Sequence, residues 1–140
     1  MEIELGYIDI ANWKLGDPLF PGWDEDHSDL EENEIILAGN NEYTLIIDYP
    51  LHTPFKHVFK THEEGMTREE LLKLIVDSYH YVYDMEERSS KIKSGLIPGM
   101  YNRNVTEGIY GIWGHDIGDL VLDSIELDEK DNIITLNVSS

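Results

Sequence analysis

The densest group of residues suited to chemistry is the stretch 110–116, whose sequence is Tyr-Gly-Ile-Trp-Gly-His-Asp. Its two glycines allow a close backbone approach beside Trp113, and His115 with Asp116 offers an acid–base pair. A histidine acts as a general base only when a partner orients its ring, and neighbours in sequence usually point apart. Either His115 and Asp116 are catalytic, or the stretch is a tight turn. In the turn, which we favour, Trp113 lies in the core and His115 or Asp116 caps backbone amides.

Basic residues mark a second candidate, in the interval 88–106. This interval holds four of the ten Lys and Arg residues of the chain and no Asp or Glu: Arg88, Lys91, Lys93 and Arg103. Such side chains hold phosphates and carboxylates, so these four, together with Trp113, are candidates for binding a small anionic ligand. The interval lacks the glycine pattern of a P-loop. Alternatively, these bases complement a helix dipole and neutralise the protein's own acids.

Three histidines recur every five residues, at positions 52, 57 and 62. Positions five apart on a strand face opposite sides, and Pro54 interrupts the spacing, so the three do not form a metal site by themselves. A zinc site assembled from His57 or His62 with His115 and a carboxylate is the remaining alternative. We therefore expect no metal and no cofactor.

The helix that must position these residues is the clearest element. Thr67-Arg-Glu-Glu70 is a capping box, in which the two end side chains satisfy free backbone amides. Apolar residues then recur at helical spacing, at positions 71, 72, 75, 79 and 82. The pattern predicts a helix over about 67–87, with its apolar stripe packed across a sheet.

Alternating apolar residues and turn residues predict the strands. The expected strands cover residues 2–10, 34–38, 43–48, 56–61, 120–127 and 133–138. The second and third are expected to form one hairpin, and the last two another. We predict an α+β fold, a single domain over 1–140. Its antiparallel or mixed sheet has about five to six strands, with the one main helix packed on one face.

Composition limits the classes of protein. The chain has 140 residues and is 41% hydrophobic, enough apolar surface to fold, and the absence of cysteine excludes disulfides and thiol chemistry. No signal peptide pattern and no apolar run of ~20 residues occurs, so we expect a cytoplasmic protein. With 29 acids against 10 bases and a net charge of −19, we expect no direct nucleic-acid or membrane binding.

The leading functional hypothesis is an acidic binding or regulatory module that acts by protein–protein interaction on a basic partner. An inhibitor, an immunity protein or an antidefence protein fits this hypothesis, and mimicry of nucleic acid is one form of it. The alternative is a small anionic-ligand-binding protein or hydrolase, with the basic 88–103 loop as anion cradle and His115 with Asp116 as acid–base element. Enzymatic activity is the less favoured interpretation. The partner and the oligomeric state stay open, as does the alternative that the acidity only maintains solubility, which we favour slightly over any specific basic partner.

Overall fold

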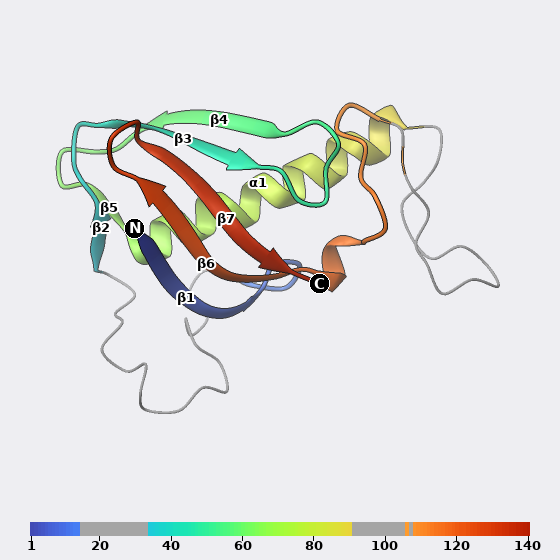
Figure 1. Ribbon diagram of the computed structural model, residues 1–140, viewed down its shortest axis with the longest axis horizontal. Helices are drawn as coiled ribbons and strands as arrows, with labels where there is room; N and C mark the ends of the chain where they lie inside the picture. The colour runs from blue at the N-terminus through green and yellow to red at the C-terminus, as the bar shows by residue number, and fades with distance from the viewer. Residues whose placement is uncertain (15–33, 91–105, 107) are drawn as a thin grey trace.

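Five strands form the main sheet of the protein, in the spatial order β1-β6-β7-β3-β4 (Figure 1). The computed structural model describes residues 1–14, 34–90, 106 and 108–140. The strands of the main sheet are β1 (Glu2–Asp9), β3 (Glu42–Ile47), β4 (Phe55–Lys60), β6 (Val121–Asp128) and β7 (Ile133–Ser139). The remaining elements are the strands β2 (Ile35–Leu37) and β5 (Met66–Thr67), the helix α1 (Arg68–Ser89) and the short 3-10 helix η2 (Ile117–Asp119).

The sheet is mixed, because β3 and β7 run parallel while every other pair of neighbours is antiparallel. β6 and β7 form the second predicted hairpin, with Asn132 at a positive φ of 55° in its turn. The predicted α+β fold with one main helix is confirmed. The small sheet of β2 and β5 was not expected from the sequence.

The first predicted hairpin, of 34–38 with 43–48, is wrong. β2 pairs with β5 instead, and β3 pairs with β4 and β7. The turn after β2 explains the difference: Asn40 has the positive φ of 55° that a hairpin turn needs, but its N–H donates to the His62 carbonyl at 3.1 Å. A Cβ on Gly39 would lie only 2.0 Å from the backbone oxygen of Glu63, the residue that follows His62. Close packing on this segment therefore directs β2 away from β3.

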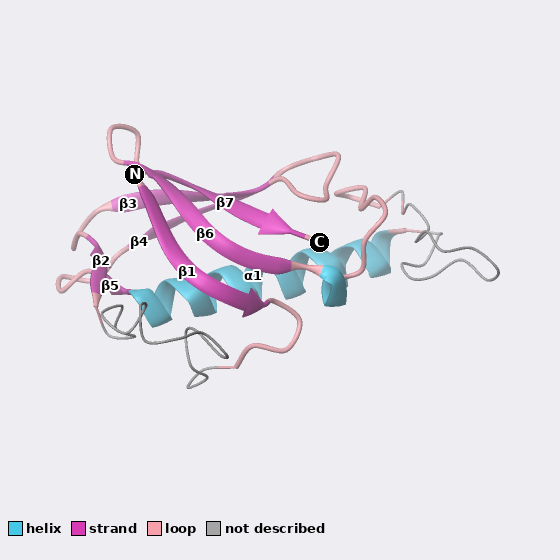
Figure 2. Cartoon of the chain, turned by 60° about the horizontal axis from the view of Figure 1, so that its bottom comes forward, coloured by secondary structure: helices cyan, strands magenta, loops and turns pink. Residues whose placement is uncertain are grey.

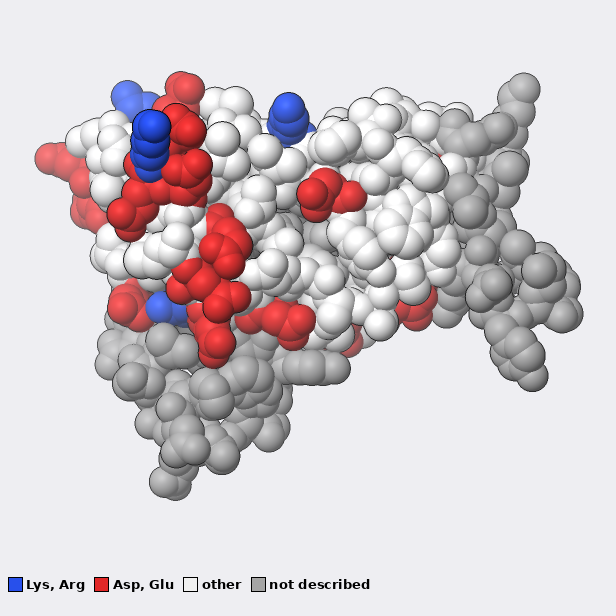
Figure 3. Space-filling view, in the orientation of Figure 1, with Lys and Arg blue, Asp and Glu red and all other residues white. Residues whose placement is uncertain are grey.

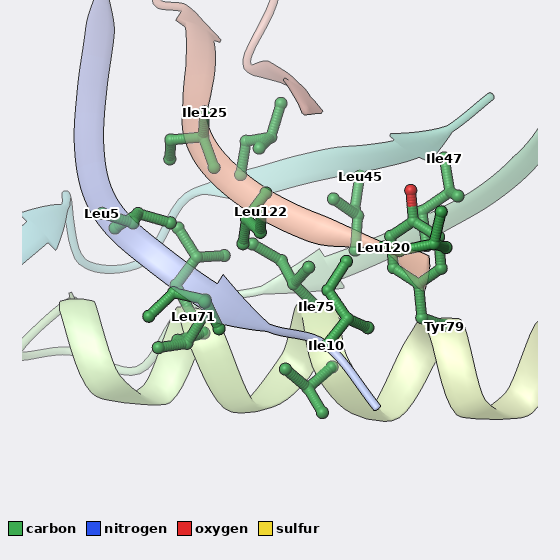
Figure 4. Close-up of a cluster of buried hydrophobic side chains, with 14 of the residues drawn as sticks. Leu5, Ile10, Leu45, Ile47, Leu71, Ile75, Tyr79, Leu120, Leu122 and Ile125 are labelled. Atoms are coloured by element: carbon green, nitrogen blue, oxygen red, sulfur yellow. The ribbon is translucent and has the colours of Figure 1, made fainter. Parts of the chain in front are cut away.

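The helix α1 begins at the predicted capping box. The Thr67 hydroxyl accepts from the Glu70 N–H at 3.1 Å, and the Glu70 carboxylate accepts from the Thr67 N–H at 3.0 Å. The backbone and side-chain hydrogen bonds of Thr67 lower the pKa of Glu70. The predicted stripe of α1 is buried against the sheet, where it meets apolar side chains of β1, β3 and β6 (Figure 4).

α1 covers one face of the main sheet, and no other helix of the described residues covers the opposite face, which we call the open face (Figure 2). On the open face, side chains of the strands alternate with those that point to the core, and Glu2, Glu4 and Glu126 are exposed there.

No described helix has the length and apolar character needed to cross a membrane.

Candidate functional site

Exposed acids gather on the open face of the sheet (Figure 3). They come from the paired strands β1 and β6 and from the turn between β6 and β7. We call this set the acidic face: Glu2, Glu4, Glu126, Asp128, Glu129 and Asp131, all of them exposed. In Figure 3 the acidic side chains lie mainly over one half of the molecule, whereas the described surface of the other half is largely uncharged.

The pairing of β1 with β6 sets two of these acids directly opposite each other. Glu2 is the register partner of Glu126, which places their Cβ atoms about 5 Å apart. Like charges in this position destabilise a strand pair. Glu2 is held in place, because its Oε2 accepts hydrogen bonds from Ser124 Oγ at 3.0 Å and from Asn137 Nδ2 at 3.3 Å. The Glu126 carboxylate makes no hydrogen bond or ion pair with the described residues.

The turn between β6 and β7 adds further fixed acids. Asp128 Oδ1 accepts from the N–H groups of Lys130 and Asp131 at 3.0 and 3.3 Å. Asn132 Nδ2 donates to the Glu42 carbonyl at 3.2 Å and ties the turn to β3. The acids of the turn are therefore held in a defined position relative to those of the strands.

A hollow of about 510 Å³ lies at the turn end of the acidic face. Three of its seven lining residues are acids and none is Lys, Arg or His: Met1, Glu126, Leu127, Asp128, Glu129, Ile133 and Thr135. Met1 contributes the N-terminal ammonium, which donates to the Leu127 carbonyl at 2.9 Å. Ammonium and guanidinium groups donate charge-assisted hydrogen bonds to such carboxylates. A single exposed ion pair contributes only about 0–1 kcal/mol, but several neighbouring acids steer and orient a basic partner.

The predicted site residue His115 contacts groups other than Asp116. Its Nε2 lies 3.2 Å from Ser140 Oγ and its Nδ1 lies 3.8 Å from Asp119 Oδ2. The Tyr83 hydroxyl donates to the His115 carbonyl at 3.0 Å, which fixes the backbone. The 3.8 Å separation of His115 Nδ1 and Asp119 Oδ2 is longer than a hydrogen bond, and the catalytic role of His115 with Asp116 stays a prediction.

Asp116 caps the 3-10 helix η2, in keeping with the turn interpretation. Its Oδ1 accepts from the Ile117 N–H at 2.9 Å, and the Asp119 carboxylate accepts from the Asp116 N–H at 3.2 Å. The turn interpretation also placed Trp113 in the core, and this part is wrong, because Trp113 is 37% exposed. The Tyr49 ring meets the Trp113 ring edge-on at a centroid distance of 5.2 Å.

The predicted basic loop is described only at its start. Arg88 is exposed and forms an ion pair of 3.2 Å with Asp84, one turn earlier on α1. Lys91, Lys93 and Arg103 lie outside the described residues. An anion cradle, and with it the small-ligand or hydrolase alternative, therefore stays a prediction.

The histidines at 52, 57 and 62 are exposed. The His57 ring stacks between Phe55 and Phe59 on β4, with centroid distances of 6.3 and 6.0 Å. Within the described ranges, no three His, Asp or Glu side chains are placed to hold one metal ion.

Glu86 is a structural residue that the sequence analysis missed. It is fully buried near the end of α1, and its carboxylate accepts from Thr106 Oγ1 and from the N–H groups of Gly108 and Tyr110 at 2.8 and 2.9 Å. Burial acts to raise the pKa of Glu86, but these hydrogen bonds outweigh it and lower the pKa. The sequence held one signal for it: Glu86 follows Val82 by four residues, so an acid occupies a position on the apolar stripe of the helix.

Comparisons of the chain with protein-family models, with curated proteins and with solved structures find no match. What the protein binds is therefore inferred from its own residues. Among these, the acidic face brings six exposed acids of β1, β6 and the turn after β6 together on one described surface.

Proposed function

We propose that the protein is an acidic binding module that recognises a basic surface of a partner protein through the acidic face. The observation that carries the proposal is the set of six exposed acids that β1, β6 and the turn after β6 bring together on the open face of the sheet. Evenly scattered acids would favour solubility alone, because solubility depends on net charge and not on its placement.

The pairing of Glu2 with Glu126 supports the same proposal. Opposed carboxylates cost stability, yet Ser124 and Asn137 hold one of the two in place. A bound ammonium or guanidinium group beside this pair would relieve the repulsion. The arrangement is therefore more favourable with a basic partner than without one.

A lysine heptapeptide serves as a defined basic probe, with binding followed by fluorescence anisotropy at 20 and 150 mM salt. The double change Glu126→Gln with Glu129→Gln removes two charges from the acidic face and leaves the hydrogen bonds of Glu2 and Asp128 intact. We expect this variant to bind the probe about three- to tenfold more weakly, since each exposed pair contributes up to about 1 kcal/mol.

The matched control is Glu63→Gln with Glu64→Gln, which removes the same charge from two exposed acids outside the acidic face. We expect its affinity to stay within about twofold of the unchanged protein, with the salt dependence retained. Equal weakening in both variants would show that only net charge matters and would overturn the proposal.

A further inference from the structure

The outer edge of β4 differs from the acidic face in the sign of its charge. β4 is an end strand of the main sheet and pairs only with β3 among the described strands (Figure 1). Its sequence, Phe-Lys-His-Val-Phe-Lys, contains two lysines, one histidine and no acid. Lys56 and Lys60 are exposed and form no ion pair of 4 Å or less within the described part of the chain, while the exposed Glu42 of β3 is the register partner of Lys60. A basic strand thus borders a chain whose net charge is −19.

The backbone of β4 has free pairing groups along this edge. The Thr61 N–H donates to the Asn41 carbonyl at 2.9 Å, and bonded residues alternate along an antiparallel ladder. The odd-numbered residues of β4 therefore bond to β3. The N–H and C=O groups of Lys56, Val58 and Lys60 point to the outer edge, where a further strand would pair.

An apolar groove of about 380 Å³ runs beside this edge, between β4 and α1. It is lined by Phe55, His57, Leu74, Asp77, Ser78 and Tyr81. The Tyr81 ring is 50% exposed, and the charge of Asp77 is paired with Lys73 at 2.5 Å. The groove therefore offers rings and aliphatic groups with little uncompensated negative charge.

We propose that an extended peptide with alternating acidic and apolar residues binds here as an added strand. Its backbone pairs with the free edge of β4, its acids lie beside Lys56 and Lys60, and its apolar side chains enter the groove. Alternate side chains of a strand point to opposite faces, as the lysines and rings of β4 do. The charge of the strand selects an acidic peptide over a basic one.

Like charges oppose the pairing of two β4 strands with each other. In an antiparallel pair centred on Val58, Lys56 of one copy faces Lys60 of the second copy. Edge lysines prevent such pairing in many sheets. The same lysines attract an acidic strand. The edge therefore favours an acidic peptide over the β4 strand of a second copy.

The probes are four heptapeptides that alternate Glu with Val, Ile, Leu or Phe, and four counterparts with Gln in place of Glu, because Lys peptides would bind the acidic face. We expect the best Glu peptide to bind at least about tenfold more tightly than its Gln counterpart, measured by isothermal titration calorimetry. Lys56→Glu and Lys60→Glu should each weaken that peptide about three- to tenfold. Lys130→Glu, the control for net charge, should change its affinity less than twofold.

Methylation of alternate backbone nitrogens of the peptide tests strand addition on the unchanged protein, so a variant that fails to fold does not prevent the test. One methylation frame should abolish binding, because it removes the N–H groups that face β4. Retained binding in both frames, equal binding of the Gln peptides, or no binding at 1 mM peptide overturns the proposal. Sedimentation of the protein alone gives the remaining outcome. Self-association that is abolished by Val58→Pro, which removes an N–H from the outer edge of β4, would assign the edge to a second copy and overturn the peptide proposal.

Discussion

At the scale of single residues, Glu86 organises the segment that leads to Trp113 and His115. Its Oε1 accepts from the N–H groups of Tyr110 and Gly111, and its Oε2 accepts from that of Gly108. A Cβ on Gly108 would lie 2.6 Å from Glu86 Oε1, so only glycine permits this approach. One buried carboxylate thus shapes a loop distant in sequence.

We predict that Glu86→Gln lowers the free energy of unfolding by about 3 kcal/mol, because the amide places a donor against several backbone donors. Urea denaturation measures the loss. Asp84→Asn is the control on the same helix, where an exposed ion pair contributes less than about 0.5 kcal/mol. Similar losses in the two variants would show that the Glu86 hydrogen bonds contribute little.

Because the pKa of Glu86 is lowered, the loss of stability in Glu86→Gln should depend on pH. Its ionisation stabilises the folded state fully above the pKa of the unfolded chain, about 4.3. This contribution is lost as the pH falls through the lower folded-state pKa. We therefore expect the stability gap between the unchanged protein and Glu86→Gln to be constant above about pH 5 and to narrow below it. A gap that widens towards low pH would contradict the assignment.

Residue types alone could locate the stretch 110–116 but not its contacts. The side chain nearest to His115 Nε2 belongs to Ser140, 25 residues away, and Asp116 is engaged in a helix cap. Such partners depend on how β7 ends beside η2, which local spacing does not encode. Glu86 was missed for a related reason, because its hydrogen-bond donors lie at least 20 residues further along the chain.

At the scale of elements, the β1–β6 pair connects stability with the proposed binding. We predict that Glu126→Gln raises the free energy of unfolding by about 0.2–1 kcal/mol, because it removes a like-charge pair with Glu2. Thermal and urea denaturation at 20 mM salt measure the gain, with Glu63→Gln as control. A lower stability would show that Glu126 serves the fold and would weaken its assignment to binding.

The elements were predictable where the information is local. The capping box and the stripe from Leu71 to Val82 specify α1, and the turn at Asn132 specifies the hairpin of β6 and β7. The partner of β2 depends on tertiary packing around Gly39 and His62, so the first hairpin was wrongly predicted. The parallel contact of β3 with β7 joins segments about 90 residues apart and has no local signal.

At the scale of the whole molecule, the net charge is −19, and on the described surface seen in Figure 3 the acids lie mainly over one half. The sequence showed the excess of acids but could not show that six of them share one open face, because β1 and β6 are far apart in the chain. The edge of β4 carries the opposite charge. The molecule therefore presents two surfaces of different sign, for which we propose two different partners.

The most direct test of the acidic face is amide chemical-shift mapping by NMR while the lysine heptapeptide is added. We predict that the largest shifts occur in β1, in β6 and in the turn through Asn132. Glu63, Glu64, Asp77 and Asp84 are exposed acids outside this surface and should shift little. Shifts spread evenly over all exposed acids, or centred away from β1 and β6, would contradict a binding surface on the open face of the sheet.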